Sequence, residues 1–348
     1  MQKRDMKSIS LQEWKEIITQ LKDQPFRAEQ IYQWLHVKQV ESMDEMTNIS
    51  KRLKEELENE YTLNNLELVE VQESKLDGTK KYLFGLWDGN VIESVLMKYK
   101  YGNSVCISSQ VGCRMGCRFC ASTIDGLVRN LTVGEMLEQV YRIQRDTGQR
   151  ISNVVIMGTG EPLDNYENLV RFLKMISHEK GCNISQRNIT VSTCGIVPKM
   201  KELANEKLQI TLALSLHASS QEKRLELMPI ANKYNLDEII EACRYYFEQT
   251  GRRITFEYSL VGGVNDSEQD AQRLSNLIKH MNCHINLIPV NPIKERKFVQ
   301  SDHSVIVAFK NKLEKSGINV TIRREMGRDI DGACGQLRKR YMERQVER

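Results

Sequence analysis

The sequence lacks the long apolar segments that membrane insertion and export require. It contains no run of about 18 apolar residues, the length that crosses a bilayer as a helix. The first residues, MQKRDMKSISLQEWKE, also lack the apolar stretch of a secretory signal. The sequence therefore predicts a cytoplasmic protein without a membrane partner. In that compartment, its nine cysteines favour metal or redox chemistry over a disulfide framework.

A large excess of one charge is also missing, since the formal net charge of the 348 residues is +4. The charge is nevertheless unevenly distributed. Residues 1–102 hold 15 Lys and Arg against 18 Asp and Glu, a net charge of −3, so that residues 103–348 carry +7. A basic excess in the larger part permits a phosphate-rich partner such as nucleic acid, although most charged surfaces are simply solvated.

The cysteine motif of the chain is one ligand short of a closed metal site. Cys113, Cys117 and Cys120 have C-x3-C-x2-C spacing, with no histidine nearby. A structural zinc takes four protein ligands, and an iron–sulfur cluster normally takes four cysteines. Three cysteines therefore predict a 4Fe-4S cluster with one iron open to a substrate. Two alternatives remain: a zinc site completed by Cys106, and three unrelated core cysteines.

Strand-like and helix-like segments alternate from residue 104 onward. This alternation is typical of βαβ units in a parallel sheet. Roughly six units are fewer than the eight that close a barrel. The predicted fold class is therefore α/β, with an open, partial (β/α)6 barrel. The predicted strands are 104–110, 152–158, 188–195, 208–217, 252–263, 284–291 and 319–325.

Two different segments precede the barrel. Residues 8–60 predict helices, the first of them capped by Ser10. The segment that follows predicts a three-strand meander, in which Asp77-Gly78 and Asp88-Gly89 form two-residue hairpin turns. The predicted divisions are a helical domain at 1–64, a β-meander extension at 65–103, the barrel at 104–325 and a short C-terminal tail at 326–348.

Small polar residues follow several predicted strands. In parallel α/β folds the site lies at the carboxyl ends of the strands, so these residues are expected to converge on one rim. The second strand leads into GTGEP, where Gly160 permits close backbone approach and Glu161 can accept hydrogen bonds from an ammonium group. Each feature alone has an ordinary structural explanation, such as a tight turn. The other rim residues are Ser192, Ser215, Leu216, His217 and Asn291.

Two further residues are unusual for their surroundings. Glu93 lies in a strand segment that is apolar on both faces, which favours a buried carboxylate with the raised pKa of a general base; the alternative is a charge that reaches solvent. Cys334 lies between Gly332 and Gly335 in the basic tail. A cysteine on a flexible segment can reach a site elsewhere, whereas the alternative is a small buried apolar residue.

Several segments together carry a resemblance to a known family. They are Cys106 seven positions before Cys113, and CRFCAST, GLVRNL, MGTGEPLDN, VSTCG, SLHA, LMPI, INLIPVNP, TIRRE and DIDGACGQLR. Over essentially its whole length the chain resembles the RlmN/Cfr group of radical S-adenosylmethionine (SAM) enzymes, and within it the dual-specificity RNA methyltransferases of the RlmN branch.

The resemblance implies a role for each motif. The three motif cysteines hold a 4Fe-4S cluster, whose open iron binds SAM and which supplies the electron that cleaves it. One SAM methylates Cys334, and a radical from a second SAM abstracts hydrogen from that methyl group. The resulting methylene radical adds to carbon 2 of adenine, which is too electron-poor for ordinary methyl transfer. Glu93 accepts the carbon 2 proton, and Cys106 releases the RNA by forming a transient disulfide with Cys334.

The resemblance also implies ligands and partners. The RNA substrates are 23S rRNA, modified at adenosine 2503, and tRNA, modified at adenosine 37. The target base must leave its stack to reach the radical. A one-electron reductant such as flavodoxin is required. The implied SAM contacts are Gly160, Glu161, Ser192, Ser215, Leu216, His217 and Asn291.

Two other functions remain open. The Cfr branch methylates carbon 8 of the same rRNA adenosine with the same cluster and redox cysteines. Pro162 after Glu161, and Ala121-Ser122-Thr123 after Cys120, favour the RlmN branch. A zinc-stabilised RNA-binding module without catalysis is an alternative of another class.

Overall fold

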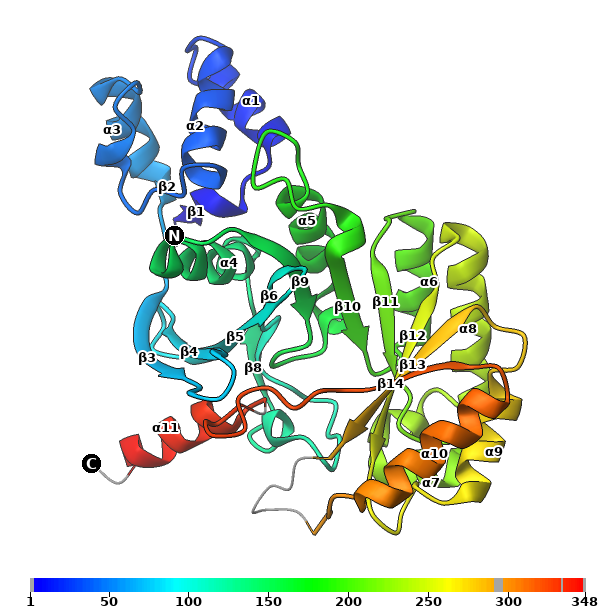
Figure 1. The fold of residues 1–348 in the computed structure, drawn as a ribbon. Helices are drawn as coiled ribbons and strands as arrows, with labels where there is room; N and C mark the ends of the chain where they lie inside the picture. The colour runs from blue at the N-terminus through cyan, green and yellow to red at the C-terminus, as the bar shows by residue number, and fades with distance from the viewer. Residues whose placement is uncertain (1–2, 291–296, 333, 347–348) are drawn as a thin grey trace.

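Residues 3–290, 297–332 and 334–346 are described by the computed structural model (Figure 1). A ten-stranded sheet is its central element, with the order β14-β13-β12-β11-β10-β9-β6-β5-β4-β3. The strands are β3 (Glu67–Glu73), β4 (Lys80–Gly85), β5 (Val91–Tyr99), β6 (Gly102–Cys106), β9 (Ile151–Ile156), β10 (Ile189–Thr193), β11 (Thr211–Ser215), β12 (Ile254–Leu260), β13 (Cys283–Pro289) and β14 (Asn319–Ile322).

The parallel part of the sheet runs from β6 through β9, β10, β11, β12 and β13 to β14. Within the described ranges, β14 and β3 are the two edges and do not pair, so the sheet is open. The crossover helices lie on the outer side of the curved sheet (Figure 1). The α/β class and the open, partial (β/α)6 barrel are confirmed. The crossover helices are α4 (Val133–Thr147), α5 (Tyr166–Ile176), α6 (Val197–Asn205), α8 (Leu236–Thr250), α9 (Glu268–Leu277) and α10 (His303–Lys315).

Local sequence signals set the ends of these helices. At α4 the Thr132 side chain accepts from the Glu135 backbone N–H, and the Glu135 side chain accepts from the Thr132 backbone N–H, which completes a capping box. Gly148 ends the helix with φ at 63°, in the left-handed region that glycine adopts most easily. Leu137 and Tyr141 are fully buried one turn apart on the same face.

The N-terminal helices contact the barrel through ionic groups. The predicted cap at Ser10 is present as a capping box with Glu13. Glu13 also accepts a 2.7 Å hydrogen bond from Arg171 of α5. Lys7 and Glu138 of α4 form an ion pair in which both side chains are buried. The elements of this region are β1 (Arg4–Asp5), α1 (Leu11–Gln20), α2 (Phe26–His36), α3 (Lys51–Glu60) and β2 (Tyr61–Thr62).

The predicted meander is present as the antiparallel strands β3, β4 and β5, and β5 continues antiparallel into β6. The prediction of two-residue turns was wrong. The connecting loops span residues 74–79 and 86–90, and only their glycines, Gly78 (φ 70°) and Gly89 (φ 79°), have positive φ. The meander and the barrel share one sheet, and the divisions expected at residues 64, 103 and 325 stay predictions.

The C-terminal segment crosses from β14, at one edge of the sheet, to the meander at the other edge (Figure 1). There Asp329 accepts hydrogen bonds from the Ser74 hydroxyl and the Lys75 backbone N–H. The Asp331 backbone N–H donates to Gln72 over 3.0 Å. The segment ends in α11 (Gln336–Val346). No helix in the described ranges is both long and apolar enough to cross a membrane.

Candidate active site

Two adjoining cavities open at the carboxyl ends of the parallel strands. The first has a volume of about 260 Å³ and receives side chains from a loop after β6 and from the ends of β9, β10, β11 and β12. The second has a volume of about 510 Å³ and lies between β5, β6 and the C-terminal segment. Cys334 and Arg323 line both.

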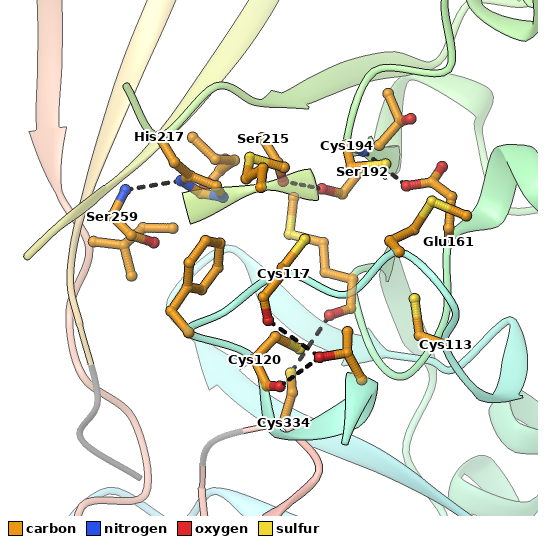
Figure 2. A pocket seen from close by; sticks show the side chains of 18 of the residues that line it. Cys113, Cys117, Cys120, Glu161, Ser192, Cys194, Ser215, His217, Ser259 and Cys334 are labelled. Atoms are coloured by element: carbon orange, nitrogen blue, oxygen red, sulfur yellow. Dashed lines mark hydrogen bonds between the residues drawn. The ribbon is translucent and has the colours of Figure 1, made fainter. Parts of the chain in front are cut away.

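The three motif cysteines lie in the loop between two short strands, β7 (Gln110–Gly112) and β8 (Leu127–Asn130). Hydrogen bonds within the loop fix its shape: the Thr123 hydroxyl donates to the carbonyls of Cys117 and Cys120, and the Cys113 backbone N–H donates to Gly126. Cys113, Cys117 and Cys120 all line the first cavity (Figure 2). Burial raises the pKa of Cys113 to about 12 and also raises those of Cys117 and Cys120.

This arrangement fits a 4Fe-4S cluster. In a cluster each cysteine binds a different iron, so the thiols face a common space without converging on one point. Among the described residues there is no group of three or more His, Cys, Asp or Glu close enough to share a single metal ion. Cys106, the expected fourth ligand of the zinc alternative, lines the second cavity and not the first.

The GTGEP segment forms the floor beside the cysteine loop. Gly160 has φ at 112°, and a Cβ there would lie 2.7 Å from Ser109 Oγ, so only glycine fits. Glu161 accepts hydrogen bonds from the backbone N–H groups of Leu163 (3.0 Å) and Cys194 (2.7 Å). Burial raises the pKa of Glu161. Glu161 lines the first cavity, and its predicted contact with an ammonium group stays a prediction.

The ends of β10 and β11 bring further predicted residues to the same rim. Ser192 Oγ and Ser215 Oγ lie 3.5 Å apart, and both line the first cavity (Figure 2). Leu216 is fully buried, and its backbone N–H donates to the Glu257 carbonyl over 3.0 Å. Its carbonyl accepts from Arg224, and Leu216 lines neither cavity, so its predicted contact with SAM stays a prediction. Asn291, the last predicted contact, lies outside the described residues.

His217 is held as a neutral ring. Its Nδ1 accepts from the Ser259 backbone N–H over 2.9 Å. Burial, reinforced by the Arg224 charge, lowers the pKa of His217 to about 3. The ring of Phe119, from the cysteine loop, packs edge-on against it at 4.8 Å between centroids. His217 thus contributes shape and a neutral polar edge to the cavity.

Cys334 and Cys106 face the second cavity together. The Cys334 thiol donates to the Met157 carbonyl over 3.5 Å. Burial raises the pKa of Cys106 to about 12, and the nearby Cys334 thiol adds to the effect. The Cys334 residue is exposed where it lines the two cavities. Protein atoms nevertheless surround its thiol, and this burial raises the pKa of Cys334 as well.

Glu93 is buried, as its apolar strand segment predicted. It forms an ion pair with Lys81 over 3.1 Å. Its two oxygens also accept 2.6 Å hydrogen bonds from the backbone N–H groups of Gly335 and Arg338, at the start of α11. Glu93 lines neither cavity in this arrangement, so its proposed role as a base stays a prediction.

Two charged residues that line the cavities were not among the predicted site residues. Glu257 lines the first cavity, and Arg323 lines both. Glu257 accepts from Asn286 over 2.9 Å, and burial raises its pKa. Its signal was present, because ITFEYSL places a carboxylate in an apolar strand as the Glu93 segment does. Arg323 had no such signal among its basic neighbours.

Family comparisons agree with this geometry. The model of a family described as "Radical SAM superfamily" matches residues 107–274. A second family model, described as "Ribosomal RNA large subunit methyltransferase N-terminal domain", matches residues 4–63.

Individual relatives match over nearly the whole chain. The chain is 65% identical to the probable dual-specificity RNA methyltransferase RlmN of Lachnospira eligens, with 97% of each chain covered. It is 62% identical to the protein of the same description from Lachnoclostridium phytofermentans, covering 99% of this chain and 96% of the relative. A crystal structure of a radical SAM methyltransferase from Sphaerobacter thermophilus superposes with a TM-score of 0.91 at 41% identity, covering 96% of this chain and 98% of that one.

Proposed function

Because the chain belongs to the RlmN family of radical SAM RNA methyltransferases, we propose that it forms 2-methyladenosine at adenosine 2503 of 23S rRNA and at adenosine 37 of tRNA. The proposed reaction uses two SAM molecules for each methyl group delivered. It takes place in the cytoplasm and draws single electrons from a reductant such as flavodoxin.

The position of Cys334 is the observation that carries this proposal. Cys334 lines both cavities. The motif cysteines line the first cavity with it, and Cys106 lines the second. Burial raises the pKa of both Cys120 and Cys106, and the nearby Cys334 thiol raises each of them further. A methyl group carried on Cys334 would therefore be within reach of a SAM molecule in the first cavity and of an adenine base in the second.

The first cavity would hold the cluster and SAM. Cys113, Cys117 and Cys120 would bind three irons, and the cluster when bound supplies the electron that cleaves SAM. Glu161 would accept from the SAM ammonium group, and the rim of Ser192, Ser215 and His217, together with Gly160, Leu216 and Asn291, would hold the rest of SAM.

Three residues outside that rim would carry the transfer. The Cys334 thiol loses its proton and attacks the methyl group of SAM; the new S–CH3 bond replaces the sulfonium bond, and S-adenosylhomocysteine leaves. After the methylene radical has joined carbon 2 of adenine, Glu93 would take the carbon 2 proton, and the surplus electron of the adduct would return to the oxidised cluster. Cys106 would then attack the Cys334 sulfur, so that an S–S bond forms as the S–C bond to the RNA adduct breaks. The carbon that leaves sulfur with the electron pair takes up a proton and becomes the methyl group on adenine. A dithiol reductant restores both thiols.

Nucleoside analysis tests the proposed function. The protein, purified and reconstituted without oxygen, is incubated with SAM, a reductant and a 23S rRNA fragment. We expect 2-methyladenosine, detected by mass spectrometry. The appearance of 8-methyladenosine instead would favour Cfr-type chemistry. A colourless protein that binds one zinc and no iron would contradict an enzymatic function.

A further inference from the structure

Arg224 is a fully buried cation at the carboxyl ends of β10 and β11. It belongs to α7 (Gln221–Leu227). Its guanidinium donates to the carbonyls of Ser215 (3.0 Å), Leu216 and Cys194 (2.7 Å). The ion pairs found among the described residues do not include it. A buried arginine held by carbonyl groups alone is unusual, because burying an unpaired charge costs several kcal/mol, on the order of the desolvation penalty of one ion.

Two cysteines are neighbours of Arg224: Cys194 and the motif residue Cys117, which pack in one buried cluster with Leu227 of the same helix. Burial lowers the pKa of Arg224, and the neighbouring Cys194 and Cys117 thiols oppose that shift. The Arg118 backbone N–H, directly after Cys117, donates to the Leu227 carbonyl over 2.9 Å. Helix α7 is therefore attached to the cysteine loop at one end and to two strand ends through Arg224.

This placement connects Arg224 to the strand ends by its own hydrogen bonds and to the cysteine loop through its helix. The carbonyls that it holds belong to Ser215 and Leu216, both proposed SAM contacts, and to Cys194, which lies two positions after Ser192, just past the end of the neighbouring strand β10. An iron–sulfur cluster held by thiolates would supply the missing negative charge, since fixed charges and hydrogen bonds near such clusters set their reduction potential.

Resting on the proposed function, we propose that Arg224 is a positioning residue with two actions: it aligns the ends of β10 and β11 for SAM, and its charge stabilises the reduced cluster. Reduction adds one electron to the cluster, and a fixed positive charge in a dry environment favours the added negative charge. Loss of the charge should therefore make the cluster harder to reduce, even where its iron content is unchanged.

Two variants separate the two actions. In Arg224→Gln the charge is lost, and we expect the midpoint potential of the cluster, measured by redox titration with electron paramagnetic resonance, to become more negative. In Arg224→Lys the charge stays but the fork of donors is lost. We expect its potential to remain near that of the wild type while its SAM dissociation constant rises roughly tenfold, the effect of about one lost hydrogen bond to a charged group.

Arg118→Gln is the matched control, because Arg118 directly follows Cys117 but is exposed. We expect it to shift the potential less than Arg224→Gln does, since water screens its charge.

Four results would overturn the proposal. One is an Arg224→Gln protein with full iron content and an unchanged potential. Another is a shift as large in the Arg118 control. If Arg224→Gln does not fold, as judged by circular dichroism, the proposal rests on Arg224→Lys, and an unchanged SAM dissociation constant there would overturn it. A wild-type protein that binds no cluster would overturn the proposed function as well, and its iron content distinguishes this failure from the others.

Discussion

Cys334 and Cys106 share a cavity, but they lie in different kinds of backbone. Cys106 ends β6 and pairs with Val95 and Val155 of the neighbouring strands. Cys334 lies in the segment between β14 and α11. In a reaction that needs one thiol to meet SAM, then RNA, then a second thiol, the mobile partner is expected to be Cys334. The strand would hold Cys106 in place for its proposed role in resolving the adduct.

Alanine variants of the two cysteines should fail at different steps. Cys334→Ala has no methyl acceptor, so we expect SAM binding and reductive cleavage at best, with no methylated RNA. Cys106→Ala can load and transfer the methyl group but cannot release it, so we expect an RNA–protein crosslink on denaturing gels. Cys182→Ala, at a cysteine that lines neither cavity, is the control. Methylation by Cys334→Ala would contradict the carrier role, and the absence of crosslink in Cys106→Ala the resolving role.

Glu93→Gln tests whether this buried carboxylate acts as a base. The substitution removes the charge opposite Lys81 and one acceptor of the α11 backbone, and it removes the proposed proton acceptor. We expect RNA methylation to fall by about 10²- to 10⁴-fold, the usual contribution of a general base. Methylation of Cys334 by SAM, followed by mass spectrometry of the protein, should continue. If Cys334 methylation stops as well, Glu93 mainly holds the C-terminal segment.

Sequence reasoning at this scale brought residues together correctly where the signal was local. The spacing of the motif cysteines within eight positions and the GTGEP motif placed them and Gly160 at one site, and all of them line the first cavity. Their roles toward a cluster and SAM stay predictions. The contact of Glu93 with Gly335 could not be predicted, because 242 positions separate them and no pattern in either segment refers to the other. Arg224 was missed for the same reason, since its three carbonyl partners carry no side-chain signature.

Helix α1 is attached to α5 through Glu13 and Arg171, and the strength of this attachment is testable. Partial burial raises the pKa of Glu13, but hydrogen bonds from Arg171, Ser10 and Arg4 lower it overall to about 2, from an ordinary 4.5. Because the pKa is lower in the folded state, the charge of Glu13 contributes stability above about pH 4.5. That contribution is lost as the pH falls toward 2.

Glu13→Gln should therefore destabilise the protein in a pH-dependent way. Glutamine retains the capping box but not the ion pairs with Arg4 and Arg171. We expect a loss of about 1 kcal/mol in the free energy of unfolding at pH 7 and pH 5, and a smaller loss at pH 3, by urea denaturation. Glu16→Gln, at an exposed position of α1, is the control. A loss of the same size at pH 3 would contradict the ionic origin.

Elements were predicted best where a repeating pattern ran over many residues. The seven parallel strands and their helices follow from apolar runs, amphipathic stretches and caps such as Ser10. The loop at Asp77-Gly78 was predicted to be shorter than it is. The dipeptide signal is local and contains no information about the C-terminal segment that packs against this loop. There the Asp77 carboxylate accepts from the Gly327 backbone N–H over 3.0 Å, so the loop is shaped by a partner from the far end of the chain.

Charge is distributed unevenly along the chain, and this distribution predicts how RNA binding depends on salt. The +7 of residues 103–348 outweighs the −3 of residues 1–102. We expect the dissociation constant of the Cys334→Ala protein for tRNA to rise roughly tenfold or more between 50 and 200 mM KCl, because phosphate contacts release bound cations. Filter binding measures this. Affinity independent of salt would contradict binding through phosphates.

The crossing of the C-terminal segment from one sheet edge to the other has a consequence for synthesis. All strands that wall the first cavity are complete once the ribosome has passed residue 322, whereas the acceptor thiol is at residue 334. If Cys334 carries the methyl group as proposed, a chain that stops between these points would retain the proposed cluster and SAM residues of the first cavity but would have no thiol to receive the methyl group. Termination before residue 334 would therefore yield proteins without transfer activity rather than partly active ones.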